Sequence, residues 1–290
     1  MNELSSRQRD PTADVGSGAR RSSISLTAGF VMGPAAAGLL AQWSPHPLVV
    51  PYLVHMAIAV PATVLLAAHG VETRTVDGRL RLRDAIRAPG LSHRRFRWVV
   101  VPMAPWIFGS AGIAYAIVPQ QVDAAIGSWG LLFATGLTVL TLGTGLAVQP
   151  LAKRLDDTSS ARAVVVSMGL MALGVVAAAG TAATGWPVMA LPTAVLLGAA
   201  YGIAVVSGLL EIRRMATPQE LAGMVGVYYA LAYVGFLAPA VLAGMSTWFS
   251  YPVMLSVLVC VALLSTIVIA SAYRKHLPGE TAVDLFQVGR

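Results

Sequence analysis

Long apolar runs without charged residues alternate with short polar connections along this chain. A helix needs about 20 mainly apolar residues to cross a hydrocarbon core of about 30 Å. Helix is the required state, because lipid offers the backbone no hydrogen-bond partners and the alternating pattern of a membrane barrel is absent. The sequence therefore predicts an all-α membrane protein with eight transmembrane helices, at residues 24–43, 47–69, 98–119, 129–150, 163–184, 187–209, 222–245 and 251–273.

The positions of the basic residues support this count, because Lys and Arg collect in the cytoplasmic connections of membrane proteins. All 20 lie in the N-terminal tail, in the connection 70–97, or directly after the fourth, sixth and eighth runs, and the alternate connections carry none. This asymmetry predicts a multi-pass protein of the cell (inner) membrane with both termini cytoplasmic. It also accounts for the net charge of +7, since a nucleic-acid-binding module would not scatter its arginines over short loops.

Composition excludes an ordinary soluble domain. Hydrophobic residues make up 56% of the chain and charged residues 11%, against about 25% charged residues in a typical soluble protein. The single cysteine, Cys260, lies in an apolar run and cannot form an intramolecular disulfide or a cysteine-based metal site. The lipid bilayer is the expected partner, and no nucleic acid, cofactor or metal is expected.

One connection is much longer and more basic than the others. Residues 70–97 join the second and third runs, and their segment "RLRLRDAIRAPG" is typical of a short helix lying on an anionic membrane surface. A secretory signal at the start is disfavoured, because the first apolar run exceeds the usual 7–15 residues. The predicted organisation is a disordered polar tail (1–23), two transmembrane helices (24–69), a basic cytoplasmic linker (70–97), a six-helix unit (98–273) and a cytoplasmic tail (274–290).

The seventh run repeats the pattern of the first. Each has a Gly-Phe pair, then a proline four or five residues after the glycine, then Ala-Gly. Each helix would therefore present one stripe of small residues: Gly29, Gly33 and Ala37 in the first run, and Gly235, Pro239 and Ala243 in the seventh. Such stripes let a second helix approach closely. If the first run repeats the seventh, the counterparts of runs three to six are expected before residue 24.

The first run also resembles a known motif. Gly29, Gly33, Pro34 and Gly38 match four of the six fixed positions of the fifth-helix antiporter motif of the major facilitator superfamily, Gly-x8-Gly-x3-Gly-Pro-x2-Gly-Gly. The resemblance to these secondary transporters implies that residues 24–275 correspond to helices five to twelve of a twelve-helix plan. The chain would then be N-terminally truncated, a partial fold with two helices of the N-terminal half and a complete six-helix C-terminal half. For the stripe around Pro34, helix packing and motion during transport are the two interpretations.

A second resemblance lies at the cytoplasmic end of the fourth run. The stretch "GTGLAVQPLAKRLDD", residues 143–157, looks like the degenerate C-terminal copy of the family's loop motif, with Gly145, Lys153 and Arg154 at the corresponding positions. In the family such loops gate transport through charge contacts with neighbouring helix ends. The alternative is that Lys153 and Arg154 anchor the helix at the headgroups.

Few residues inside the runs could couple transport to an ion. Intramembrane ionisable residues are the default functional candidates, and only His55 and Glu211 qualify. Glu211 lies near Arg213 and Arg214, so an interfacial or ion-paired role competes with a proton-carrying one. His55 could titrate near neutral pH, or serve as a neutral hydrogen-bonding residue.

Polar and aromatic residues within the runs supply candidates for a substrate cavity. The hydroxyls of Thr135 and Thr138 could line it, or could bond only to carbonyls one turn back. Aromatic rings combine apolar area with a polar tip, which suits an amphipathic substrate. The aromatic candidates are Trp106, Tyr115, Tyr201, Tyr228, Tyr229 and Tyr233.

Transport is the function that these features predict. The sequence contains no phosphate-binding glycine loop, no HExxH, no paired intramembrane carboxylates and no GxSxG, so no enzyme is expected. We expect a secondary transporter that exports small amphipathic compounds, working with a missing N-terminal segment or through self-association. The alternative is a truncated, non-transporting remnant or a membrane interaction protein.

Overall fold

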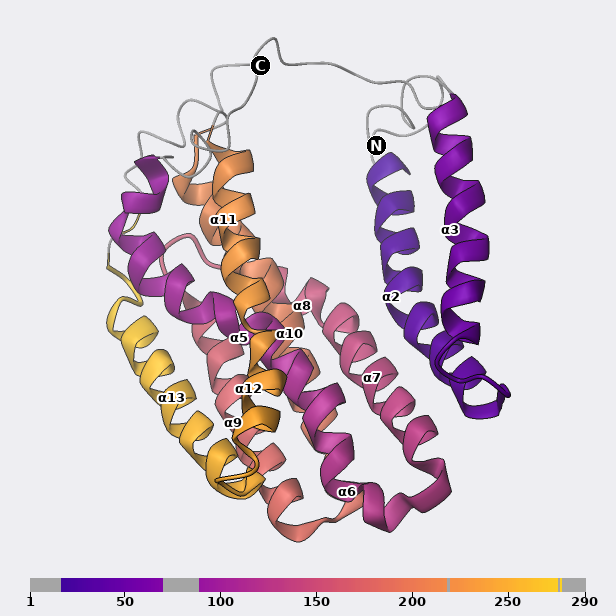
Figure 1. Ribbon diagram of the computed structural model, residues 1–290. Coiled ribbons are helices and arrows are strands. Elements are labelled where there is room, and N and C mark those ends of the chain that lie inside the picture. Colours follow the sequence, from indigo (N-terminus) through magenta and orange to yellow (C-terminus); the bar gives the residue numbers. More distant parts are fainter. Residues whose placement is uncertain (1–16, 70–88, 218–219, 276, 278–290) are drawn as a thin grey trace.

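The computed structural model describes residues 17–69, 89–217, 220–275 and 277, which form helices and no strand (Figure 1). The expected all-α class with long apolar helices is confirmed. Six helical stretches are long and apolar enough to cross a membrane, as a multi-pass membrane protein requires. They are Val50–Ala68, Phe96–Leu155, Arg162–Thr184, Pro187–Met215, Leu221–Met245 and Tyr251–Ser271.

The longest stretch is a helical path that turns back on itself. Its 60 residues exceed what one crossing needs, and Gly127, at φ 63°, reverses the chain between α6 and α7 (Figure 1). Two π-helical segments, η2 and η3, each lead into a helix whose second residue is proline, where the ring displaces a carbonyl of the preceding turn. The elements are η2 (Phe96–Val100), α5 (Val101–Gly112), η3 (Ile113–Ile117), α6 (Val118–Ile126), η4 (Gly127–Trp129), α7 (Gly130–Ala147) and α8 (Gln149–Leu155).

The helices from α5 onward form a bundle that is packed around α10. Helix α10 (Pro187–Met215) contacts α5, α7, α8 and α9 (Arg162–Thr184), and α9 also packs on α13 (Tyr251–Ser271). Small residues bring these helices close: a Cβ on Gly198 or Gly202 would overlap the α7 backbone at Thr141 or Gly145. The bundle thus forms the buried core of the molecule.

The predicted seventh helix is broken in the structure. Helix α11 (Leu221–Val234) ends at a turn formed by Gly235 and Phe236, and α12 (Leu237–Met245) continues from there. Pro239 explains the break, because its ring lacks an N–H and clashes with the carbonyl four residues earlier, that of Gly235. By contrast, α2 (Ser17–Trp43) contains Pro34 and stays continuous.

A two-helix unit, α2 and α3 (Val50–His69), lies beside the bundle and contacts it mainly through α2 and α7 (Figure 1). The amide of Gln42 adds one tie, donating to the carbonyl of Ser128 at 3.2 Å. None of the apolar window of α3 is buried within the protein. Helix α2 already begins at Ser17, inside the stretch expected to be a polar tail, whereas the segment expected as a surface helix lies mostly outside the described residues.

Candidate functional site

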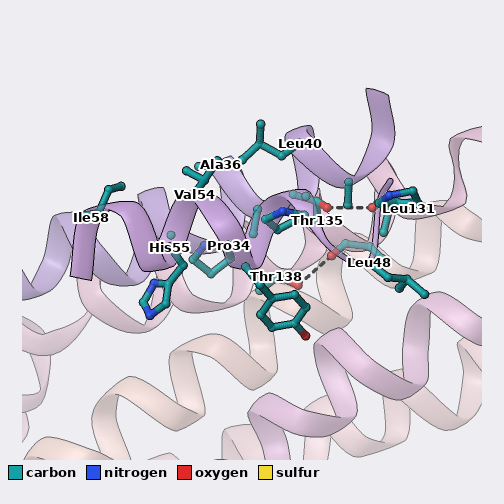
Figure 2. A pocket seen from close by; sticks show the side chains of 18 residues that line it. Pro34, Ala36, Leu40, Leu48, Val54, His55, Ile58, Leu131, Thr135 and Thr138 are labelled. Carbon is teal, nitrogen blue, oxygen red and sulfur yellow. Dashed lines mark hydrogen bonds between the residues drawn. The ribbon is translucent and has the colours of Figure 1, made fainter. Parts of the chain in front are cut away.

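A pocket of about 650 Å³ lies between α2, α3 and α7 (Figure 2). Three groups of sequence candidates meet there: Gly33, Pro34 and Gly38 of the motif, the cavity candidates Thr135 and Thr138, and the coupling candidate His55. The other lining residues are mostly alanine, leucine, valine and proline. The pocket is therefore an apolar hollow with a few polar groups, the usual composition of a small-molecule site.

The small-residue stripe of α2 contributes to this pocket more than to packing. Nothing lies within 4 Å of a Cβ added at Gly29 or Gly33, so among the described residues no neighbour uses that stripe. The expected packing role of these two glycines therefore has no partner among the described residues and stays a prediction. Only Gly38 makes the close contact, because a Cβ there would overlap the side chain of Thr135 on α7.

The threonine hydroxyls are both bonded and available. Thr135 donates to the carbonyl of Leu131, and Thr138 to that of Ala134, each at 2.8 Å. This is the backbone bonding that the sequence analysis considered, yet both residues also line the pocket. Because a hydroxyl donates one proton and keeps two acceptor lone pairs, the two oxygens present acceptors to a ligand.

His55 is an exposed polar group of the pocket. Its imidazole extends from α3 into open space beside Pro34 (Figure 2) and is exposed. A neutral imidazole carries one donor and one acceptor. Tyr52 also lines the pocket and is 70% exposed. The imidazole of His55 and the hydroxyl of Tyr52 can donate hydrogen bonds to a ligand, whereas the threonine hydroxyls already donate theirs to the backbone.

The aromatic candidates do not line this pocket. Phe108 of α5, which the sequence analysis missed, is the centre of a separate aromatic group. Its ring stacks on Phe236 at 4.6 Å and on Tyr233 at 5.0 Å between centroids, and lies 6.1 Å from Tyr201. No local sequence pattern marks Phe108, because its ring partners lie far along the chain.

Two aromatic candidates are structural. The hydroxyl of Tyr228 lies 3.2 Å from the carbonyl of Ala204 and 3.1 Å from that of Val205, and its ring is fully buried. The indole of Trp106 donates to the hydroxyl of Ser265 on α13 at 3.2 Å. Among the described residues, no ring contact joins either side chain to Phe108. Tyr115 and Tyr229 are partly buried, and Tyr229 contacts Tyr228 edge-on at 5.3 Å.

A buried charge cluster closes one end of the bundle. Arg95, just before η2, is fully buried and forms a two-point ion pair with Glu211 of α10, Nε to Oε2 at 2.5 Å and Nη2 to Oε1 at 2.8 Å. Arg214 bonds to Glu211 at 3.1 Å and to Asp156, after α8, at 2.5 Å. The remaining Arg95 nitrogen donates to the carbonyl of Lys275 at 3.2 Å. Glu211 is thus ion-paired, and four segments meet at this cluster.

Arg95 was expected to lie in the linker, and its burial was not predicted. The spacing of Arg95, Val99 and Met103, four residues apart, is typical of one face of a helix. In the structure all three side chains are buried. The cluster also changes the expectation for the loop motif. Lys153 and Arg154 are exposed and form no ion pair within the described residues, whereas Gly145 is buried at the crossing of α7 and α10.

Two loops at this end hold further carboxylates. Glu220 accepts hydrogen bonds from Thr217 and from the amide of Gly90 at 3.3 Å, and the bond from the Thr217 hydroxyl is the main cause of its lowered pKa. Asp157 accepts from the amide of Ser159 and from the hydroxyls of Ser159 and Ser160, which lowers its pKa to about 2. Each carboxylate therefore stabilises a connection between helices.

The chain matches no known protein family, no curated protein and no solved structure. The resemblance to the major facilitator superfamily stays a prediction that rests on residues 29–38 and 143–157. The functional argument therefore depends on the pocket and on the charge cluster.

Proposed function

We propose that this chain is a membrane transporter of small amphipathic molecules, of the secondary type that the major facilitator superfamily exemplifies. The observation that carries the proposal is the pocket between the two-helix unit and α7. Substrate sites of secondary transporters lie between their helical units, near the bilayer midplane. An apolar pocket that is open to the surface of α2 and α3 suits compounds that reach it from the bilayer, which favours export.

The proposed topology has eight crossings, formed by α2, α3, α5 with α6, α7, α9, α10, α11 with α12, and α13. The stretch Phe96–Leu155, which turns back at Gly127, supplies two of these crossings. Helix α2, which is not among the six stretches described above, supplies one more. The basic loops would then lie on the cytoplasmic side of the inner membrane, together with both termini. In this topology the Arg95 cluster would lie on the same side.

The proposed mechanism is a change in the contact between α2 and α7. Gly38 lies against Thr135 in that contact, so a shift of the two-helix unit would change the surroundings of the pocket residues of α7. The charge cluster keeps the cytoplasmic ends of α5, α8, α10 and α13 together during the shift. The open face of α2 fits the expectation that transport needs a further helical segment or a second copy of the chain.

Dye binding and flux in proteoliposomes would test this function. Thr138→Val keeps the side-chain volume and removes a pocket acceptor, so binding of a fluorescent amphipathic dye should weaken about fivefold, the value of one hydrogen bond. Thr266→Val is the matched control, because Thr266 on α13 makes the same bond to a carbonyl one turn back, at 2.7 Å, and lies outside the pocket. Equal binding by both variants, or no saturable binding to the unaltered chain, would contradict the proposal.

A membrane interaction protein without transport activity is the second candidate. The observation that favours it is the exposure of α3 and of the stripe at Gly29 and Gly33, which leaves a wide apolar face unpaired in the described structure. A folded, monodisperse protein that shows no flux with any dye, and whose dye binding is unaffected by Thr138→Val, would support this candidate.

A further inference from the structure

Four exposed basic residues lie where the bundle starts and where it ends. Arg94 and Arg97 lie at the entry to α5, and Arg274 and Lys275 follow α13. Although these pairs are far apart in sequence, the structure brings their backbones together. Arg95, between the first two, donates to the carbonyl of Lys275 at 3.2 Å, and η2 packs on α13. Buried Arg95 therefore fixes the position of both exposed pairs.

The acidic residues at this end are already bonded within the protein. Glu211 and Asp156 pair with Arg95 and Arg214, while Glu220 and Asp157 accept bonds from their own loops. Across the described ranges, no ion pair involves any of the four exposed basic residues. This end of the molecule therefore presents positive charge that the neighbouring carboxylates do not neutralise.

Apolar and aromatic groups place this charge at a membrane surface. Trp98 is 50% exposed, follows Arg97 directly and lies four residues after Arg94, so it shares a helical face with Arg94. Tryptophan concentrates at the level of lipid headgroups. The guanidinium of Arg274 lies 5.9 Å from the ring centre of its neighbour Tyr273, which keeps the charge beside an aromatic surface. Below these residues, α5 and α13 are apolar.

We propose that Arg94, Arg97, Arg274 and Lys275 form a binding site for the headgroup of an anionic phospholipid, with Trp98 beside its acyl chains. Guanidinium groups bind phosphate oxygens through paired hydrogen bonds, and lysine adds a further point charge. The inference rests on the membrane topology of the proposed function. A bound lipid would bridge the first and last helices of the bundle directly above the bond from Arg95 to Lys275.

Lipid binding to the purified full chain tests this site. The site variant carries Arg97→Gln, Arg274→Gln and Lys275→Gln. The matched control carries Lys153→Gln, Arg154→Gln and Arg213→Gln, which removes the same charge from three exposed residues of the same end, on α8 and α10. Binding of phosphatidylglycerol and of phosphatidylcholine is measured by native mass spectrometry at low salt.

The unaltered chain should retain phosphatidylglycerol in preference to phosphatidylcholine. Each basic residue near an anionic surface contributes about fivefold to affinity, so the site variant should bind phosphatidylglycerol about 100-fold more weakly, and the control variant about as well as the unaltered chain. Arg97→Lys with Arg274→Lys keeps the charge but not the paired hydrogen bonds, so it should bind more tightly than the glutamine variant and more weakly than the unaltered chain, which separates loss of charge from misfolding. If both glutamine variants lost the same affinity for phosphatidylglycerol, the lipid would be attracted by the overall positive charge of this end and the proposal would be overturned. Equal retention of the two lipids by the unaltered chain would also overturn it.

Dye binding measured on the same variants keeps the two proposals apart. The pocket shares no residue with the lipid site, so dye affinity should be unchanged in the site variant. If dye binding by the unaltered chain fails while the lipid preference remains, the transport proposal is contradicted and the lipid site stands. If the unaltered chain binds dye but shows no lipid preference, the lipid site is contradicted and the transport proposal stands.

Discussion

Residues 29–38 and 235–244 share one sequence pattern but have different surroundings. In the second copy, a Cβ on Gly235 would overlap the backbone of α5 at Pro105 and Gly109, and Pro239 packs against Gly112. In the first copy, Gly29 and Gly33 face open space, and only Gly38 meets a neighbour. A stripe of small residues thus permits close packing, but the neighbouring helix decides whether it occurs.

The same contrast separates the two units as wholes. The bundle from α5 onward combines close backbone contacts with an ion pair that is buried between distant segments. The two-helix unit rests on the bundle through α2, and its α3 leaves its apolar surface for lipid or another chain. Substitutions in the bundle should therefore destabilise the protein strongly, and equivalent changes in α2 and α3 should not.

The largest difference is expected at the buried ion pair. Glu211→Leu leaves the guanidinium of Arg95 buried without its carboxylate, which should lower the free energy of unfolding by about 3–5 kcal/mol. His55→Leu, in the two-helix unit, should change it by less than about 0.5 kcal/mol, because His55 is exposed. Thermal unfolding in detergent measures both effects.

Replacing both partners of the pair provides the control. Arg95→Met combined with Glu211→Leu removes both charges and should recover much of the loss, since apolar groups of similar volume often replace a buried pair without cost. If Glu211→Leu alone were neutral, the cluster would not be what distinguishes the two units.

The second largest difference compares the two glycine stripes directly. Gly235→Ala forces α11 and α12 away from the α5 backbone and should cost about 1–3 kcal/mol. Gly33→Ala adds a methyl group in open space, and the better helix propensity of alanine should stabilise α2 by about 0.5–1 kcal/mol. The comparison fails if both substitutions shift thermal unfolding in the same direction.

The contact between the two units should show an intermediate response. Gly38→Ala meets the side chain of Thr135 as far as its Cβ, so rotation of that side chain cannot relieve the whole overlap, α2 must shift, and a cost of at least about 1 kcal/mol is expected. Thr135→Ala removes the Oγ1 and Cγ2 atoms and should relieve part of the clash, giving a favourable coupling of at least about 0.5 kcal/mol in a double-mutant cycle. Additive effects would mean that Gly38 does not hold α2 on α7.

The sequence predicted the helices well where local signals mark their ends. Helices α9 and α13 begin and end within two residues of the runs 163–184 and 251–273, because polar and proline residues interrupt the apolar pattern there. The break between α11 and α12 was missed, although Pro239 was noted. Proline in a helix can be absorbed, as Pro34 is in α2, and the sequence alone does not show which outcome the neighbours favour.

The candidate site was predicted in part for the same reason. His55, Thr135 and Pro34 were each chosen for their own chemistry, and the structure brings them into one pocket. Arg95 and Phe108 were missed, because their roles depend on Glu211 and on Phe236, which are more than 100 residues away in the chain. Trp106 and Tyr228 were chosen as cavity residues but face the helix core. The sequence showed which residues have suitable chemistry, but it did not show which residues distant in the chain contact one another.

Acid should produce the smallest difference between the units, and its sign follows from Asp157. Bonds from Ser159 and Ser160 lower its pKa from 3.8 to about 2, so its stabilising contribution is complete above about pH 4 and disappears as the pH falls toward 2. The two-helix unit contains no Asp or Glu between residues 17 and 69. The temperature of thermal unfolding should therefore fall slightly between pH 5 and pH 2 in the unaltered chain, and should fall less in Asp157→Asn. The destabilisation caused by Gly38→Ala should stay constant over the same pH range. A cost of Gly38→Ala that changed with Asp157 protonation would show that the α2–α7 contact and the loop after α8 form a single cooperative unit.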